Sequence, residues 1–274
     1  MDLFPRAFLL VFCQFAVGGI FCLSIPPFHE IERGYYKSSA FVFVLLAVLA
    51  LIGRLALWWE HGSAAPGDLV EIALWAVFVA CSGGYLASLW GDNVAWRARL
   101  FSASWMVGVV ALIAFAESYR QAPLLSIETF LFPLSFLLSA LVLGGAISGM
   151  LLGHWYLIDQ DLSLRPLEQV FAVYRGSLWA QLGLVVVLLA SLALVGDGAS
   201  RGAVARVLSE HQALLTARLI VSPIGAGVLA WMIGRTLRIP QTMAATGLFY
   251  IAVLAVLVGE LMGRFLLFRS GLPL

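Results

Sequence analysis

The sequence predicts an all-α integral membrane protein, a bundle of eight transmembrane helices that forms a single transmembrane domain over residues 1–274. Three observations support this fold class. The chain is 62% hydrophobic and only 11% charged, whereas a soluble domain is about 25% charged. Its mean hydropathy is +0.99. Long apolar runs recur along the chain, each close to the roughly 20 residues that a helix needs to cross a bilayer.

The eight runs are separated by turn-forming residues. In chain order, the expected spans are 6–25, 38–59, 68–90, 99–119, 129–152, 177–196, 213–234 and 244–268. Proline removes a backbone donor and glycine tolerates turn conformations, so both residues end helices. The breaks are Pro26-Pro27, Pro66-Gly67, Gly91-Asp92, Pro123, Pro166, Gly196-Asp197-Gly198 and Pro240. The two longest connections, 157–176 and 197–212, are amphipathic, and we expect them to lie on the membrane surface.

Basic residues in the short loops predict the orientation, because loops rich in arginine and lysine stay on the cytoplasmic side. The loops after the first, third, fifth and seventh spans carry eight: Arg33, Lys37, Arg97, Arg99, Arg165, Arg175, Arg235 and Arg238. The opposite side carries five: Arg6, Arg120, Arg201, Arg206 and Arg269. Both termini are therefore expected outside, in a multi-pass protein of a bacterial inner (plasma) membrane.

Charged residues inside the expected spans gather at one depth. When the helices are threaded alternately, six fall in the outer half of the membrane: Arg54, Glu71, Glu117, Arg218, Glu260 and Arg264. A charge in hydrocarbon costs at least about 2.5–3.5 kcal/mol, so such residues are functional hypotheses by default. Glu260 and Arg264 are four residues apart and can pair on one helix face. Gly259 and Gly263 allow close backbone approach. A packing role and a binding or proton-handling role both remain open for this pair. We expect the binding site near the outer face to be supported by Glu117, Arg218, Glu260 and Arg264.

The end of the second span and the start of the third predict a ring-binding slot. His61 stands at the outer boundary, where imidazole titrates near neutral pH, and Glu71 enters from the same side ten residues later. Together they could exchange the protons of a quinol, while Arg54 keeps a carboxylate ionised. Aromatic walls are expected from Trp58, Trp59 and Trp75. The alternative is that His61 and Glu60 are merely wetted interfacial groups.

The composition excludes several classes of site. Cys13, Cys22 and Cys81 lie singly in apolar runs, which argues against iron–sulfur clusters and structural zinc, so no metal ligand is predicted. The net charge of +1 gives no reason to expect nucleic acid.

Two further patterns carry alternatives. His29 with His154, and His61 with His211, form pairs near opposite sides, which is the arrangement of a di-haem b-type cytochrome, although these residues stand at helix ends. Packing roles are expected for the mid-membrane amide of Gln14 and for the glycines Gly145, Gly149 and Gly153.

Four stretches resemble one family. They are FCQFAVGG at 12–19, EHGSA at 60–64 with EIA at 71–73, the glycine-rich 133–153, and GELMGR at 259–264. The chain resembles the dimethyl sulfoxide reductase anchor subunit (DmsC-like) and, more broadly, the NrfD-like quinone-interacting membrane subunits. The resemblance spans most of the chain, and its most specific elements are the last stretch and the pair His61 and Glu71.

The resemblance implies a membrane anchor subunit of a respiratory or photosynthetic oxidoreductase complex. Such a subunit binds quinone (menaquinone or ubiquinone) near the outer face, without haem or an iron–sulfur cluster of its own. It exchanges electrons with an iron–sulfur or haem subunit docked outside, alongside other membrane subunits and lipid. By resemblance, His61 and Glu71 match positions implicated in menaquinol handling. The alternatives are a di-haem b-type anchor and a non-catalytic scaffold or assembly subunit.

Overall fold

A computed structural model describes residues 3–61, 66–120, 126–159, 161–239 and 241–274, with the backbone alone at residues 61, 66 and 67. Eight helices are long and apolar enough to cross a membrane, which confirms the predicted number of spans. The described residues contain helices and turns but no strand. Which end of the bundle faces outward stays a prediction.

Six of the spans are single helices that follow the predicted order. They are α1 (Leu3–Cys22), α2 (Arg33–His61), α3 (Pro66–Ser88), α4 (Val94–Ser118), α5 (Glu128–Trp155) and α6 (Arg165–Leu194). The seventh span is composite and the eighth is one helix: α8 (Gln212–Leu219), the π-helix η1 (Ile220–Ala226), α9 (Gly227–Leu237) and α10 (Thr242–Ser270). All eight spans begin before the predicted apolar segments, and four of them also end after those segments: α2, α5, α9 and α10.

Of the two stretches predicted to lie on the membrane surface, one contains a separate short helix and the other includes the start of a span. The stretch 197–212 contains a short separate helix, α7 (Gly198–Ser209), which begins where the carboxylate of Asp197 accepts a hydrogen bond of 2.8 Å from the Ser200 amide. The stretch 157–176 was assigned wrongly from 165 onward, because α6 already begins at Arg165. Pro166 suits the first helical turn, and Leu167, Val170, Phe171 and Tyr174 are buried at helical spacing.

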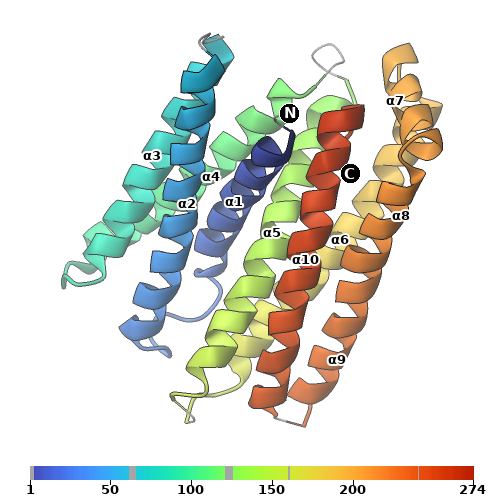
Figure 1. Ribbon diagram of the computed structural model, residues 1–274. Coiled ribbons are helices and arrows are strands. Elements are labelled where there is room, and N and C mark those ends of the chain that lie inside the picture. The colour runs from blue at the N-terminus through green and yellow to red at the C-terminus, as the bar shows by residue number, and fades with distance from the viewer. Residues whose placement is uncertain (1–2, 62–65, 121–125, 160, 240) are drawn as a thin grey trace.

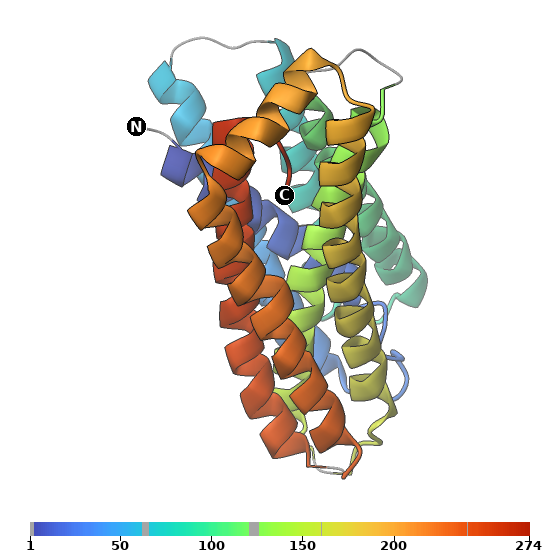
Figure 2. The same ribbon diagram turned by 90° about the vertical axis from the view of Figure 1, so that its right-hand side faces the viewer.

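The bundle has two recognisable ends (Figure 1). Both chain termini and α7 lie at the end that we call the terminal face, and we call the other end the distal face. Helices α2, α3 and α4 lie on one side of the bundle and α6, α9 and α10 on the other, with α1 and α5 between them (Figures 1 and 2). In the apolar windows of α1 and α5, 61% of residues are buried, against 28% in α2 and 22% in α3. The central pair is therefore the core of the bundle.

Glycines explain how closely α5 packs against its neighbours. A Cβ atom at Gly144 would lie 2.2 Å from the Gly18 carbonyl carbon, so α1 and α5 are in backbone contact. The Gln14 amide donates to the Phe136 carbonyl oxygen over 3.1 Å across the same interface, which confirms its predicted packing role. The predicted ladder of Gly145, Gly149 and Gly153 is also confirmed. A Cβ at these positions would meet, in order, Tyr174 at 2.9 Å, Phe249 at 2.3 Å and Thr246 at 2.4 Å.

Candidate functional site

The six charges predicted inside the spans lie nearer the terminal face than the distal face, and five of them fall into two groups. One group, which we call the cavity pair, consists of Arg54 on α2 and Glu71 on α3. The other, which we call the buried cluster, joins Ser139, Gln181, Arg218, Glu260 and Arg264 from α5, α6, α8 and α10. The remaining charge, Glu117, lies at the end of α4.

The cavity pair borders an open cavity of about 780 Å³ at the terminal face. Its walls come from α1, α2, α3 and α4, and its charged and aromatic lining is Arg6, Arg54, Asp68, Glu71, Phe115, Glu117 and Tyr119. This terminal-face cavity therefore combines both signs of charge with aromatic rings.

Arg54 and Glu71 form a direct ion pair, and their side chains are 15% and 12% exposed. The guanidinium carbon of Arg54 also lies 5.2 Å from the centroid of the Phe115 ring, within cation–π range. Oε1 of Glu71 is buried and accepts no hydrogen bond from any described residue. Because a buried acceptor without a partner is costly, this oxygen is suited to receive a ligand donor.

The rim of the cavity carries a second carboxylate. Nε of Arg120 donates to Oε2 of Glu117 over 2.7 Å, and this pair is also partly exposed. Tyr119 contacts Phe115 in an edge arrangement at 5.2 Å and stacks with Phe136 at 6.4 Å. The aromatic rings thus form a wall that runs from the rim into the bundle.

The structure places the other predicted site residues in different surroundings. His61 is the last residue of α2, so its backbone is at the terminal face, but its side chain lies outside the described residues. Trp58 is partly buried and Trp59 is 81% exposed on the outside of the bundle. Trp75 is buried edge-on against Phe78 at 5.7 Å. The three tryptophans are not part of the described cavity lining.

The buried cluster is almost sealed from solvent. Glu260 and Arg264 are 0% exposed and Arg218 is 2% exposed. Glu260 accepts from Arg264 over 3.2 Å, which confirms the predicted pairing, and from Arg218 over 3.5 Å. Gln181 adds a hydrogen bond of 2.7 Å to the same carboxylate. Ser139 accepts from Gln181 over 3.0 Å and also from Arg264.

Local backbone features bring these charges together. A Cβ at Gly259 would lie 2.1 Å from the Cβ of Ser222, and one at Gly263 would lie 2.5 Å from Nε of Arg218. The predicted close approach at both glycines is therefore confirmed. Arg218 belongs to the last turn of α8, directly before the π-helix η1, which contains Pro223. Proline removes one ladder hydrogen bond, and π-helical segments are frequent at functional sites.

Aromatic rings connect the two charged groups. Arg54 lies over Phe115, and the guanidinium carbon of Arg264 lies 4.7 Å from the centroid of the Phe136 ring. The centroids of Phe115 and Phe136 are 6.1 Å apart. The two guanidinium groups are therefore separated by two ring systems that also fill the space between α4 and α5.

Two of the histidines, His29 and His154, make separate polar contacts in the part of the chain that the structure describes. The His29 side chain is 82% exposed and lies 3.7 Å from Glu30. Nδ1 of His154 lies 3.4 Å from the Tyr250 hydroxyl oxygen. Among the described residues, no three His, Cys, Asp or Glu side chains form a group that could hold a metal ion. The di-haem alternative, which involves His61, stays a prediction.

Sequence reasoning did not identify the aromatic wall or the polar partners of the buried cluster. Phe115 and Tyr119 stand in an apolar run, where hydrophobic periodicity does not distinguish a residue that lines a cavity from one that faces lipid. Ser139 and Gln181 are small or polar residues of a kind that is common in packed helices. Comparison of the chain with protein-family models, with curated proteins and with solved structures found no match.

Proposed function

We propose that this chain is a membrane subunit of a bacterial electron-transfer complex and binds quinone or quinol in the terminal-face cavity. The observation that carries the proposal is the cavity itself, where the Arg54–Glu71 pair borders a space of about 780 Å³ beside Phe115 and Tyr119. A quinone head group is a flat ring with two oxygens. It needs aromatic contact for the ring and hydrogen-bonding groups at each oxygen.

The residues suggest how quinol oxidation would proceed. Oε1 of Glu71 would accept the hydrogen bond and then the proton of one ring hydroxyl, while Arg54 would donate to the other oxygen. His61, at the end of the adjacent helix, would take the second proton. Glu117 at the rim would pass protons toward water. Each quinol would become a quinone with the release of two protons and two electrons, and the electrons would pass to the iron–sulfur or haem subunit docked on this face.

The buried cluster supports a second reading, a non-catalytic scaffold. Its three charged side chains are at most 2% exposed, and none of them lines the terminal-face cavity. A sealed set of charges that joins four helices is what helix packing requires. We therefore assign the buried cluster to stability and the cavity pair to ligand binding.

The test compares two carboxylates at the same face. Glu71→Gln keeps the side-chain shape but removes the proton acceptor, and in the reconstituted complex we expect quinol turnover to fall by about 10²-fold. Glu60→Gln is the matched control, because Glu60 is an exposed carboxylate one residue before the end of α2. It should retain wild-type turnover.

His61→Ala is measured in parallel with Glu71→Gln. Both variants should leave the partner subunit's activity with soluble electron donors unchanged, which shows that the complex is assembled. Unaltered quinol kinetics in both variants would overturn the site and favour the scaffold reading. A haem absorbance spectrum in the purified chain would instead favour the di-haem alternative.

A further inference from the structure

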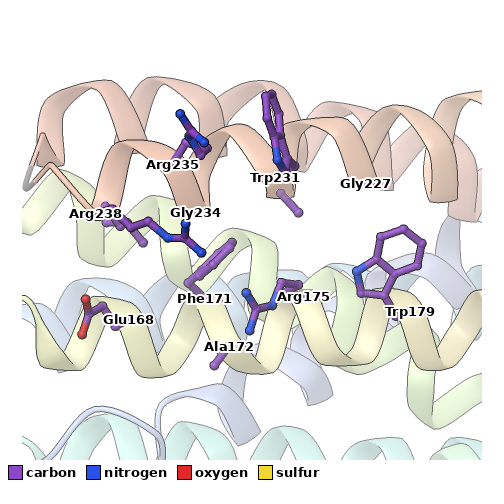
Figure 3. Close-up of a pocket in the computed structure, with 12 residues that line it drawn as sticks. Glu168, Phe171, Ala172, Arg175, Trp179, Gly227, Trp231, Gly234, Arg235 and Arg238 are labelled. Atoms are coloured by element: carbon purple, nitrogen blue, oxygen red, sulfur yellow. The ribbon is translucent and has the colours of Figure 1, made fainter.

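A second cavity lies at the distal face, far from the charged groups described above. It is a groove of about 420 Å³ between α6 and α9, lined by three arginines and by aromatic rings (Figure 3). Two arginines come from α9 and the residue that follows it, and the third comes from α6: Arg235, Arg238 and Arg175. We call this cavity the distal groove.

Among the described residues, none of the three guanidinium groups has an acidic partner. Arg175 lies over the Phe171 ring at 5.3 Å and Arg235 over the Trp231 ring at 5.8 Å. Within the part of the chain that the structure describes, neither they nor Arg238 form a side-chain hydrogen bond or ion pair. Figure 3 shows Arg175 and Arg238 on either side of Phe171, with Arg238 reaching from the end of α9 toward α6.

The depth of these arginines matches the headgroup region of a membrane. Helix α6 has 30 residues, which makes it about 45 Å long, whereas the hydrocarbon core is about 30 Å thick. The apolar runs 177–196 and 213–234 end beside Arg175 and Arg235. The positive charges therefore lie at the boundary of the hydrocarbon, on the side that the loop charges assign to the cytoplasm.

The apolar half of the groove continues deeper into the membrane. Trp179 and Trp231 are 54% and 65% exposed, although both line the groove. Opposite the α6 rings, α9 presents glycines: a Cβ at Gly227 would lie 3.7 Å from Trp179, and one at Gly234 would lie 3.1 Å from Phe171. The missing side chains leave a slot that opens toward the lipid and is bordered by tryptophans, which favour the membrane interface.

We propose that the distal groove is a binding site for an anionic phospholipid. The phosphodiester would be held by Arg175, Arg235 and Arg238, since guanidinium groups bind phosphate oxygens with paired hydrogen bonds. An acyl chain would lie along Trp179 and Gly227. A transmembrane helix of another subunit would satisfy the apolar slot but would leave three arginines without a counter-charge. Basic pockets between transmembrane helices on the cytoplasmic side are suited to anionic headgroups.

Glu168 is the one carboxylate among the described lining residues. It stands seven residues before Arg175 on α6, about 10 Å farther out along the helix axis. The groove thus keeps an excess of positive charge at headgroup level, with the carboxylate toward water. This placement would disfavour a second phosphate at the mouth of the groove.

The test measures lipid binding to the purified, delipidated full chain by native mass spectrometry. Phosphatidylglycerol and phosphatidylcholine with the same acyl chains are the probes, and inorganic phosphate is the third arm. The wild type should bind phosphatidylglycerol at least about tenfold more tightly than phosphatidylcholine. The triple variant Arg175→Gln, Arg235→Gln, Arg238→Gln should lose this preference.

Two further variants keep the test decisive. Lys37→Gln, Arg99→Gln, Arg165→Gln removes three positive charges from the same face outside the groove and should keep the preference. Gly227→Phe fills the slot beside Trp179 without changing charge and should weaken phosphatidylglycerol binding; it decides the outcome if the triple arginine variant does not fold. An unchanged lipid preference in the triple arginine variant, or an unchanged phosphatidylglycerol affinity in Gly227→Phe, would overturn the proposal. Binding of inorganic phosphate without binding of lipid would also overturn it. So would a crosslinker at position 231 that captures a protein segment in place of lipid.

Discussion

The cavity pair and the buried cluster contain the same kinds of residue at a similar depth, yet their surroundings differ. Glu71 is 12% exposed beside an open cavity and is held by one arginine. Glu260 is 0% exposed and accepts hydrogen bonds from two arginines and a glutamine. A charge inside a span therefore does not by itself indicate a ligand-binding role. Its burial and the number of its hydrogen-bond and ion-pair partners distinguish a packing role from a ligand-binding role.

The largest expected effect comes from breaking the buried cluster. Glu260→Gln should destabilise the protein by about 3–5 kcal/mol, because it leaves two arginines in a sealed interior without a carboxylate. The free energy of unfolding in a denaturing-detergent titration measures it. Arg264→Met should act in the same direction. If both variants have the same free energy of unfolding as the wild type, the cluster does not hold the helices together.

A smaller effect is expected from crowding the helix contact beside the cluster. Gly259→Ala places a Cβ 2.1 Å from that of Ser222, and the resulting backbone shift should cost about 1–3 kcal/mol. Gly247→Ala is the matched control on the same helix, because nothing lies within 4 Å of a Cβ there. The changes in melting temperature of the two variants should differ in sign or in size. Equal melting temperatures would show that η1 and α10 are not tightly apposed at Gly259.

The cavity pair should matter less for stability than for turnover. Glu71→Gln weakens a charge-assisted hydrogen bond, and we expect a loss of about 1.5–3 kcal/mol at most, below that of Glu260→Gln in the same titration. A loss equal to that of Glu260→Gln would remove the distinction between the two groups. Quinol turnover should fall further in Glu71→Gln than in Glu260→Gln, when both variants are measured in an assembled complex.

The smallest effect concerns α7, outside both groups. The hydrogen bond from the Ser200 amide lowers the pKa of the Asp197 carboxyl below its usual range. A lowered folded-state pKa adds stability above the unfolded-state pKa of about 3.9, and this stability is lost as the pH falls through the folded-state value. The protection factors of the first α7 amides, measured against their intrinsic exchange rates, should therefore fall at acidic pH. Asp197→Asn keeps an acceptor but should abolish that pH dependence.

The sequence was sufficient for the spans but not for the partners of their charges. Apolar runs and breakers located all eight spans, and helical spacing predicted the pairing of Glu260 with Arg264. The choice of Glu260 as the partner of Arg218, with Glu71 and Glu117 also possible, depends on how α8 packs against α10. That packing depends on Ser222 meeting Gly259, a contact between distant residues that no local pattern encodes.

The same limit applies to the cavity walls. Tryptophans near the boundary were the visible aromatic candidates, whereas the described wall uses Phe115 and Tyr119 from α4. In a membrane helix nearly every position is apolar, so hydrophobic periodicity does not show which face is turned inward. The error at 165–176 has a related origin, because the polar residues of that stretch obscured its buried helical face.

The π-helix at Ile220–Ala226 also fixes a rotational phase. A π-helical turn accommodates one residue more than an α-helical turn, and each residue of an α-helix advances the azimuth by about 100°. Deleting a single residue from this segment would let the seventh span run as one regular α-helix. That deletion would leave Arg218 facing the Glu260 carboxylate, whereas a regular α-helix through all seven residues, with α9 held in place, would swing Arg218 about a quarter-turn away from it. The π-helical segment thus holds one additional residue without changing the phase of Arg218, and a further single-residue insertion should be far less tolerated here than in the loops.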